Sequence, residues 1–256
     1  MKAVLTVLGS GTSMGVPTIG CPCPVCNSPD PHDRRTRPSV LVQYEGHSVL
    51  IDTTPDFREQ AIREGLRQLD AVLYTHAHAD HIMGLDDLRP LTFWRDGNIP
   101  LYGYAPVIGR LRHIFSYIFE GDYNYGGRAE VQLHEISGPV ELFGACFLPV
   151  KVMHGSEEIH GYRFGSAAYV TDFSEIPEES MAQLTGLDIL FLDALRRRPH
   201  PTHSTLENSV RLVERLQPRR AFFTHISHDL GHEETNRSLP ENVRLAYDGL
   251  KLEFEI

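Results

Sequence analysis

Four apolar stretches of the sequence, each typical of a buried strand, end in a histidine or an aspartate. The endings LYTH, VKVMH, YVTD and FFTH stop at His76, His154, Asp172 and His225. Side chains at strand ends are held by rigid, buried structure while they face an open rim. Because histidine and aspartate are metal-ligand types, this pattern favours a fold that brings several strand ends to one metal site.

The stretch THAHADH, residues 75–81, strengthens this interpretation. His76 and His78 are separated by one residue, so both can point to one side of an extended loop. Asp80 and His81 then begin a turn into the next helix and can reach a second ion. Nitrogen and oxygen ligands of this kind suit zinc, manganese or iron(II). The alternative, a polar loop with solvated histidines, is disfavoured by the spacing.

The sequence therefore predicts a site for two metal ions. Its seven candidate ligands are His76, His78, Asp80, His81, His154, Asp172 and His225. One ion would take three histidines, and the other Asp80, His81 and His225. Asp172 is suited to bridge them, because a carboxylate has two oxygen donors. Two ions roughly 3.5–4 Å apart can activate water and neutralise charge on a transferring group.

Length and composition limit the class of protein. The chain has 256 residues and no internal linker or repeat, so we expect one domain spanning residues 1–256. Its 41% hydrophobic and 23% charged residues are typical of a globular enzyme. The net charge of −10 argues against nonspecific binding to nucleic acid or to anionic membrane.

The opening apolar run is short and soon interrupted by glycines, and no stretch approaches the roughly 18 apolar residues of a membrane span. We therefore expect a cytoplasmic protein, in which disulfides are rare and clustered cysteines more often bind metal.

Three of the four cysteines lie within GCPCPVC, residues 20–26. An odd number cannot pair completely, so a zinc site with a fourth ligand is favoured. The predicted set is Cys21, Cys23, Cys26 and His228, which would form a closed, structural zinc site. Two alternatives remain open: His232 as the fourth ligand, or three free thiols with His228 at the surface. Cys146 is expected to be a buried core residue.

Strand-like and helix-like segments occur in both halves of the chain. The expected strands are residues 3–8, 39–45, 47–52, 71–75, 99–103, 146–153, 161–165, 167–171, 188–194, 219–224 and 250–256. The expected helices are residues 54–69, 82–90, 106–119 and 204–216, with Thr54 and Ser204 as N-caps. This order favours two sheets packed together with helices outside.

THAHADH together with His154, Asp172 and His225 resembles the metallo-β-lactamase superfamily, and the resemblance covers essentially the whole chain. It implies an α+β fold (αββα) of two mixed β-sheets flanked by helices, with a two-metal hydrolase site on its rim. No cysteine lies in the second metal position, which departs from common β-lactamases and matches the hydrolase and phosphodiesterase branches.

GCPCPVC after GSGTSMGVP, followed by RRTRPS and by THISH, resembles the PhnP-like phosphodiesterases. Those enzymes open a five-membered cyclic phosphate on phosphoribose. The resemblance implies a structural zinc at the cysteines and His228, and an active-site histidine outside the metal shell at His203. Asp80 and His203 are therefore the catalytic candidates. An imidazole beside the metals could give a proton to the leaving oxygen, whereas the alternative places His203 in solvent beside a helix.

The expected activity is metal-dependent hydrolysis of a small phosphodiester such as 5-phosphoribosyl 1,2-cyclic phosphate. The expected cofactors are two active-site ions, manganese or zinc, and one structural zinc. The alternatives are a lactone or thioester hydrolase, a tRNA 3′-end endonuclease, and a non-catalytic metal-dependent carrier. We expect a small-molecule partner, without nucleic acid or membrane, and leave a homodimer open.

Three further segments are assigned no single role. The arginines of LRRRPH could meet an anionic substrate or lie in a solvated loop; they are Arg196, Arg197 and Arg198. Residues 33–39 either pack under the metal loop or lie at the surface. Residues 102–127 could form part of a pocket, although their apolar residues at helical spacing favour the core. Asp52 is expected to orient the metal loop rather than to bind metal.

Overall fold

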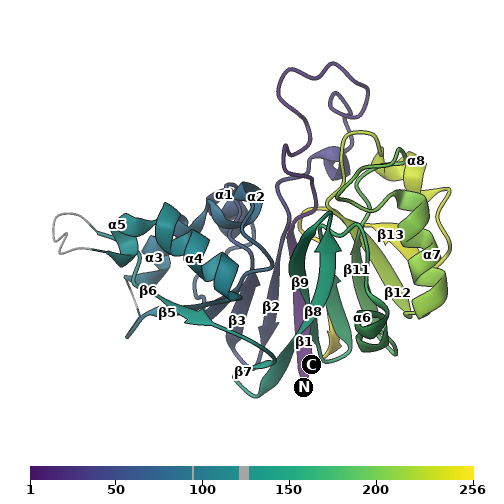
Figure 1. The fold of residues 1–256 in the computed structure, drawn as a ribbon. Helices are drawn as coiled ribbons and strands as arrows, with labels where there is room; N and C mark the ends of the chain where they lie inside the picture. The colour runs from purple at the N-terminus through teal and green to yellow at the C-terminus, as the bar shows by residue number, and fades with distance from the viewer. Residues whose placement is uncertain (94, 121–126) are drawn as a thin grey trace.

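Two seven-stranded sheets face each other, and helices cover the outer side of each sheet (Figure 1). This computed structural model describes residues 1–93, 95–120 and 127–256. The arrangement confirms the predicted α+β (αββα) fold of two mixed sheets flanked by helices. Among the described residues, none of the helices is long and apolar enough to cross a membrane.

The first sheet has the strand order β14-β1-β2-β3-β4-β5-β6. Its strands are β1 (Lys2–Gly9), β2 (Ser39–Tyr44), β3 (His47–Ile51), β4 (Ala71–Leu73), β5 (Ile99–Gly103), β6 (Val131–Glu135) and β14 (Lys251–Glu255). β3 to β6 run parallel, whereas β1 pairs antiparallel with β14 and with β2. The last strand therefore lies beside the first, and both termini lie at the lower edge of Figure 1.

The second sheet has the strand order β13-β12-β11-β10-β9-β8-β7. Its strands are β7 (Val140–Leu142), β8 (Ala145–His154), β9 (Glu157–Phe164), β10 (Ala167–Val170), β11 (Ile189–Asp193), β12 (Arg220–Thr224) and β13 (Val243–Leu245). β10 to β13 are parallel, and β8 and β10 are both antiparallel to β9. The carboxyl ends of β8, β10, β11 and β12 therefore meet at one edge of this sheet.

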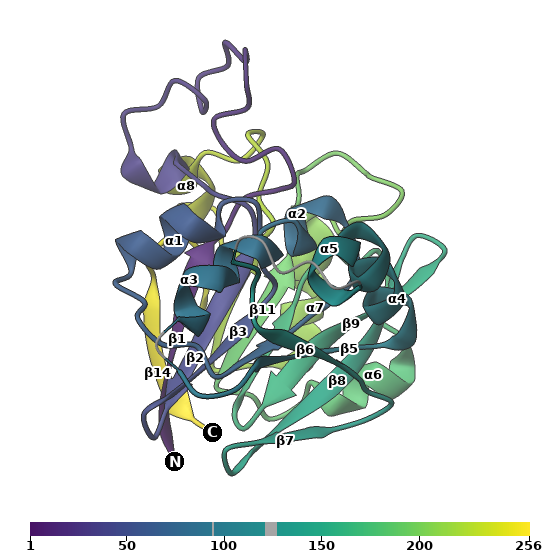
Figure 2. The ribbon, with the colours of Figure 1, turned by 90° about the vertical axis from the view of Figure 1, so that its left-hand side faces the viewer.

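The helices divide between the two outer faces. Figure 2 shows the first five over the first sheet: α1 (Phe57–Arg63), α2 (Ala79–Ile82), α3 (Arg89–Thr92), α4 (Ala105–Ile114) and α5 (Ser116–Phe119). The other three accompany the second sheet: α6 (Glu178–Gln183), α7 (Leu206–Leu216) and α8 (His232–Asn236). Two short 3₁₀ turns, η1 (Pro31–Asp33) and η2 (Leu85–Leu88), complete the helical elements of the described residues.

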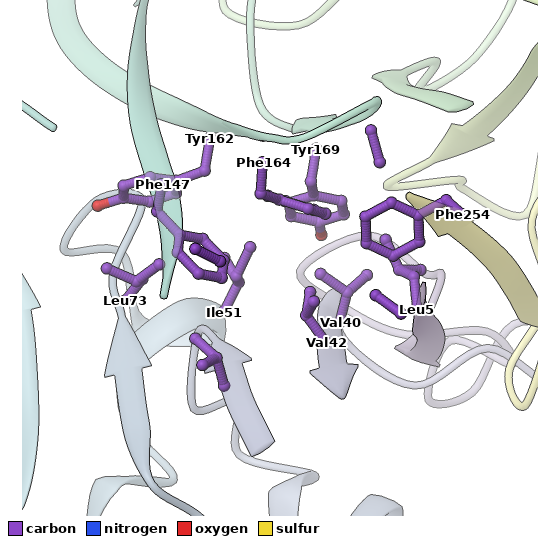
Figure 3. Close-up of a cluster of buried hydrophobic side chains, with 14 of the residues drawn as sticks. Leu5, Val40, Val42, Ile51, Leu73, Phe147, Tyr162, Phe164, Tyr169 and Phe254 are labelled. Atoms are coloured by element: carbon purple, nitrogen blue, oxygen red, sulfur yellow. The ribbon is translucent and has the colours of Figure 1, made fainter. Parts of the chain in front are cut away.

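Apolar side chains from both sheets fill the space between them (Figure 3). Leu5, Val40 and Ile51 of the first sheet meet Phe147 and Phe164 of the second, and all five are fully buried. Two further apolar clusters join each sheet to its own helices. Three buried layers of this kind give the sandwich a rigid frame, because burial of apolar surface is the main favourable term in folding.

The predicted strands are present, and the ones that sequence reasoning missed lie at the sheet edges. β6, β7 and β13 are the outermost strands of their sheets, and two of them have only three residues. An edge strand is short and partly solvated, so it lacks the apolar run of a central strand. The small helices α6 and α8 were also missed.

The helix predicted over residues 54–69 is shorter than expected. It begins at Phe57, and its N-cap is Asp56 rather than Thr54. The Asp56 carboxylate accepts hydrogen bonds from the Arg37 backbone N–H and from Arg37 Nη1, both at 2.8 Å. Thr54 instead accepts a hydrogen bond from the Asp56 N–H at 3.0 Å, in the turn before the helix. The Asp56 carboxylate is therefore engaged by Arg37 and makes no capping hydrogen bond to the helix.

Other predicted helices are also altered. Residues 82–90 form separate short elements, and residues 106–119 divide into α4 and α5. Within the latter segment Phe115 and Ile118 are buried as predicted, whereas Ile114 is exposed. The N-cap of α7 is Thr205, which accepts a hydrogen bond from Asn208 N–H at 3.1 Å. The predicted cap Ser204 is buried one residue earlier.

Cys146 is exposed, so the prediction of a buried core residue was wrong. It lies on β8 between Ala145 and Phe147, which are both buried. Side chains alternate between the two faces of a strand, so burial of these neighbours turns Cys146 outward.

The segment between β1 and β2 rises above the upper edge of the sandwich in Figure 1. Arg35 lies in the part of this segment that is nearest to β2, and its side chain is fully buried. Its guanidinium donates to the Ser227 and Leu230 carbonyls at 3.0 and 2.8 Å and pairs with Asp33 at 2.8 Å. Arg35 is therefore not at the surface, but the loop that it packs against is the one after β12, which the sequence analysis did not name for this segment.

We expect Arg35→Ala to lower the free energy of unfolding by about 3–5 kcal/mol, since it removes the positive charge beside the buried Asp33 carboxylate and the donor to the Ser227 and Leu230 carbonyls. Urea denaturation followed by circular dichroism measures this loss. The matched control is Arg34→Ala, which removes the exposed neighbouring arginine and should cost less than about 1 kcal/mol. Equal losses in the two variants would contradict the fastening role of Arg35.

Candidate metal centre and active site

The predicted ligands gather at the edge where the strand ends meet. His154 ends β8, and Asp172 and His225 follow β10 and β12 within two residues. Asp172 and His225 adopt left-handed backbone conformations with φ of 57° and 56°, as does Asp52 after β3 with φ of 67°. This conformation is uncommon for residues other than glycine, and it persists where the surrounding structure enforces it. The sharp turns aim these side chains at one point.

Three histidines form the first cluster. The ligand atoms of His76, His78 and His154 lie within 4.8 Å of one another. Their ring centroids are 4.6 to 5.6 Å apart. His76 and His154 are buried, whereas His78 is exposed and faces the open side. This is the three-histidine set that the sequence predicted for one ion.

Four buried residues form the second cluster: Asp80, His81, Asp172 and His225. His81 Nε2 lies 3.3 Å from Asp80 Oδ2 and 3.5 Å from Asp172 Oδ1. The other oxygen of Asp172 lies 3.2 Å from His225 Nε2 and 3.8 Å from Nε2 of His76. Asp172 therefore faces both clusters, as a bridging carboxylate must.

The donor atoms fit two divalent cations. His76 Nε2, His81 Nε2, His225 Nε2 and Asp80 Oδ2 are all buried and have no hydrogen-bond partner among the described residues. A buried polar atom without a partner is costly, so native structures almost always satisfy it. Imidazole nitrogens and carboxylate oxygens that converge on one point, with no hydrogen-bond donor among them, are a typical ligand set of a metal ion.

The charges of the second cluster lead to the same conclusion. Burial alone would lower the pKa of His225, but the Asp172 and Asp80 carboxylates outweigh it and raise the pKa to about 9. For the same reason the pKa of His81 is raised well above its usual range. Burial would raise the pKa of Asp172, yet the neighbouring imidazoles hold it well below its usual range. The buried carboxylates thus demand positive charge, which protons or metal ions can supply.

Outer hydrogen bonds fix the orientation of the ligands. His81 Nδ1 lies 2.7 Å from Asp52 Oδ2, and the same carboxylate accepts from the Thr75 N–H and hydroxyl at 2.9 and 2.8 Å. His154 Nδ1 donates to the Thr202 carbonyl at 2.9 Å, which leaves Nε2 for an ion. Such partners set the tautomer of a ligating histidine. Asp52 lies where the sequence predicted, behind the metal loop.

His203 lies against the cluster rather than in open solvent. Its ring stacks on His225 with centroids 4.6 Å apart and meets His154 edge-on at 4.7 Å. Its Nδ1 lies 2.7 Å from Asp193 Oδ2, so Nε2 remains for a substrate. Burial, with the nearby His225, lowers the pKa of His203 to about 4. The imidazole is therefore neutral at rest and can exchange a proton at Nε2.

Asp193 is a site residue that the sequence analysis missed. It ends β11, between β10 and β12, and is completely buried. The signal was available, because the apolar stretch DILFLDA also ends in a strand-terminal aspartate. The Thr202 carbonyl offered no comparable signal, since a backbone atom is visible only once the fold is known.

The structure brings His228 to the three clustered cysteines. His228 Nδ1 lies 3.1, 3.7 and 3.4 Å from the Sγ atoms of Cys21, Cys23 and Cys26. Tetrahedral zinc with usual bond lengths separates a sulfur ligand from a nitrogen ligand by about 3.6 Å, so the group fits zinc. Burial raises the pKa of the Cys26 thiol to about 11, which a bound cation would reverse.

The alternative fourth ligand, His232, lies elsewhere. It packs against His32 with ring centroids 4.6 Å apart and against Tyr247 at 5.7 Å. Among the predicted arginines, Arg196 and Arg198 line a cavity beside His203, whereas Arg197 lines a different one. Part of the segment 102–127 lies outside the described residues, namely 121–126.

Comparisons with known proteins agree with this geometry. A family model described as a beta-lactamase superfamily domain matches residues 47–226. A solved structure, described as a new diphosphatase from the PhnP family, is 63% identical with a TM-score of 0.94, covering 99% of this chain and 98% of that one. Zinc-bound PqqB from Methylobacterium extorquens is 21% identical with a TM-score of 0.78, covering 97% and 99%, which supports the fold alone.

A curated relative from Porphyromonas gingivalis, named octanoyltransferase, is 38% identical over 98% of this chain. The chain spans only 51% of the length of that relative. A coenzyme PQQ synthesis protein B from Methylobacterium nodulans is 27% identical over 75% of this chain and 72% of its own length. These names describe different activities, so the names alone do not define the reaction.

We expect Cys23→Ser to remove one zinc equivalent per chain and to leave the metal content of the histidine clusters unchanged, since serine cannot supply a thiolate ligand. Elemental analysis of the purified protein measures this. The matched control is Cys146→Ser, which changes the exposed cysteine on β8 and should retain all metal. Full zinc content in Cys23→Ser would contradict the four-ligand assignment.

Proposed function

Since the chain belongs to the PhnP family of the beta-lactamase superfamily, we propose that it is a two-metal phosphohydrolase that cleaves a P–O bond in a small substrate. The main support is the pair of adjacent ligand clusters, both faced by the buried Asp172, with the His203–Asp193 pair beside them. This arrangement supplies both charge neutralisation and a positioned proton carrier, the two requirements of phosphoryl transfer to water.

Two kinds of substrate bond are candidates. The first is a cyclic phosphodiester such as 5-phosphoribosyl 1,2-cyclic phosphate, the substrate class expected from the sequence motifs. The second is a diphosphate linkage, which is favoured by the 63% identity to a PhnP-family diphosphatase. Both reactions use water to displace an oxygen leaving group from phosphorus, so one set of residues can serve either.

His76, His78 and His154 would hold one ion, and Asp80, His81 and His225 the other, with Asp172 between them. We propose zinc or manganese, since both accept this nitrogen and oxygen set. When bound, two such ions lower the pKa of water and offset negative charge on the phosphoryl group. The Cys₃His group would hold a structural zinc.

The residues of the chain provide orientation and proton transfer. Asp193 fixes the His203 ring through Nδ1, so that Nε2 faces the substrate. An anionic phosphoryl oxygen beside Nε2 would raise the pKa of His203, because a nearby negative charge favours the protonated imidazole. His203 can then pass a proton to the departing oxygen. Asp52 keeps His81 in place by the 2.7 Å contact to Nδ1.

The test is hydrolysis of a panel by metal-loaded protein. The panel contains 5-phosphoribosyl 1,2-cyclic phosphate, ADP-ribose as a diphosphate, bis(p-nitrophenyl) phosphate, a lactone and a thioester. We expect turnover of phosphorus substrates that disappears in Asp172→Ala, since this change removes the bridging ligand. Turnover confined to the lactone or thioester would overturn the proposal and favour the carbonyl hydrolase.

His203→Gln should lower kcat on the phosphorus substrates by roughly 10²–10⁴-fold, because glutamine cannot carry the proton. The metal content should be unchanged, since His203 is outside both predicted ligand sets. The matched control is His113→Gln, an exposed histidine on α4, which should leave kcat unaltered. A normal kcat in His203→Gln would exclude the proposed proton transfer.

A further inference from the structure

The two ligand clusters differ in burial, in charge and in the support of their side chains. We propose that they hold their ions unequally: the four-residue second cluster keeps its ion tightly, whereas the three-histidine first cluster releases its ion reversibly. The activity of the protein then follows the concentration of free divalent metal. This regulation rests on the proposed function, because that function needs both ions at once.

Burial is the first difference between the clusters. All four residues of the second cluster are buried, whereas His78 of the first cluster is exposed and faces the open side. Water and small chelators can therefore compete for the position of His78 without any movement of the fold. At the second cluster the covering structure must open before water can replace a ligand.

The loss of an ion also has unequal costs. Three buried donor atoms of the second cluster have no hydrogen-bond partner within residues 1–93, 95–120 and 127–256, namely His81 Nε2, His225 Nε2 and Asp80 Oδ2. In the first cluster the same is true of one atom, His76 Nε2. Because an unpartnered buried polar atom is unfavourable, the second cluster is destabilised more when its ion leaves.

Charge acts in the same direction. The second cluster has two carboxylates, Asp80 and Asp172, which together match the two positive charges of one divalent ion. The first cluster has three imidazoles and only a share of Asp172. Asp172 Oδ2 lies 3.2 Å from His225 Nε2 but 3.8 Å from His76 Nε2, so this carboxylate lies nearer to the second cluster. In calcium sites, affinity is tuned by the number of charged ligands and by the rigidity of the site, and the same reasoning applies here.

His78 is the least supported ligand of the first cluster. The Nδ1 atom of His76 lies 3.0 Å from the Thr75 hydroxyl, and His154 Nδ1 donates to the Thr202 carbonyl at 2.9 Å. His78 has no comparable hydrogen bond in the part of the chain that the structure describes. Ordering a free side chain to bind an ion costs conformational entropy, so His78 limits the affinity of the first cluster.

The two ions therefore load in a fixed order. The second cluster retains its ion when free metal is scarce, and the first cluster fills last. A protein with one ion lacks the paired charge neutralisation that phosphoryl transfer to water needs, so it is inactive. The free metal concentration that gives half-maximal activity is accordingly set by the affinity of the first cluster.

The test uses the full chain loaded with manganese, since the hard Mn²⁺ ion competes poorly for the soft thiolates of the Cys₃His group. The protein is dialysed against buffers of decreasing free Mn²⁺, and its metal content is measured by elemental analysis. Electron paramagnetic resonance distinguishes a spin-coupled Mn²⁺ pair from an isolated ion. We expect one ion to leave at a free Mn²⁺ concentration roughly 10- to 100-fold higher than the other, while the coupled spectrum is replaced by the isolated one.

Two variants assign the ions to their clusters. His78→Ala should keep one Mn²⁺ with the affinity of the tightly held wild-type ion and show only the isolated spectrum. Asp80→Ala should weaken the tightly held ion by roughly 10- to 100-fold, because it removes one of the two carboxylates. The matched control is His113→Ala, which removes an exposed histidine on α4 and should retain both ions and the coupled spectrum.

Release of both wild-type ions over the same range of free Mn²⁺ would overturn the inference. Loss of both ions in His78→Ala, or an unchanged tightly held ion in Asp80→Ala, would also overturn it, since the order of the clusters would then be different. These readouts do not depend on turnover. Absence of turnover of every phosphorus substrate would overturn the proposed function and leave the unequal binding standing, whereas turnover by a protein whose ions leave together would overturn only the inference.

Discussion

Two buried carboxylates, Asp80 and Asp172, determine what the rest of this structure must provide. A carboxylate that is buried away from water loses its solvation, which is unfavourable unless a positive charge lies beside it. The surrounding imidazoles cannot satisfy both carboxylates as neutral groups, so the site requires protons or cations. The two sheets bring the required side chains together, because several strands end at one edge and the backbone turns sharply after them.

The strand-terminal histidines and aspartates could be recognised from the sequence because two physical signals coincide in them. A central strand is almost uniformly apolar, and a metal ligand directly after it interrupts that run. Asp193 gave a similar signal and was missed, since the apolar run continues past it with Ala194 and Leu195. Thr202 and Arg35 act through contacts between segments far apart in the chain, which no local pattern reports. The predicted cap at Thr54 was wrong, because the helix begins two residues later and Asp56 is its N-cap.

The cysteine-rich loop and the active site are parts of one connected structure. Ile226 N–H donates to the Ser10 carbonyl at 3.0 Å, and Thr12 N–H donates to the Ile226 carbonyl at 3.1 Å. Arg35 adds contacts to the Ser227 and Leu230 carbonyls. The loop after β12 is thereby held on one side by the N-terminal segment and on the other by the second sheet. A structural zinc at the Cys₃His group would close the cavity wall beside His203.

His225 and His228 are three residues apart and face different ligand groups, one at the histidine clusters and one at the cysteines. Surface loops usually tolerate gain or loss of residues. Here the number of residues between the two histidines sets the distance between two separate centres. A single inserted or deleted residue would move one histidine away from its partners. The length of this stretch is therefore more constrained than the side chains of Ile226 and Ser227.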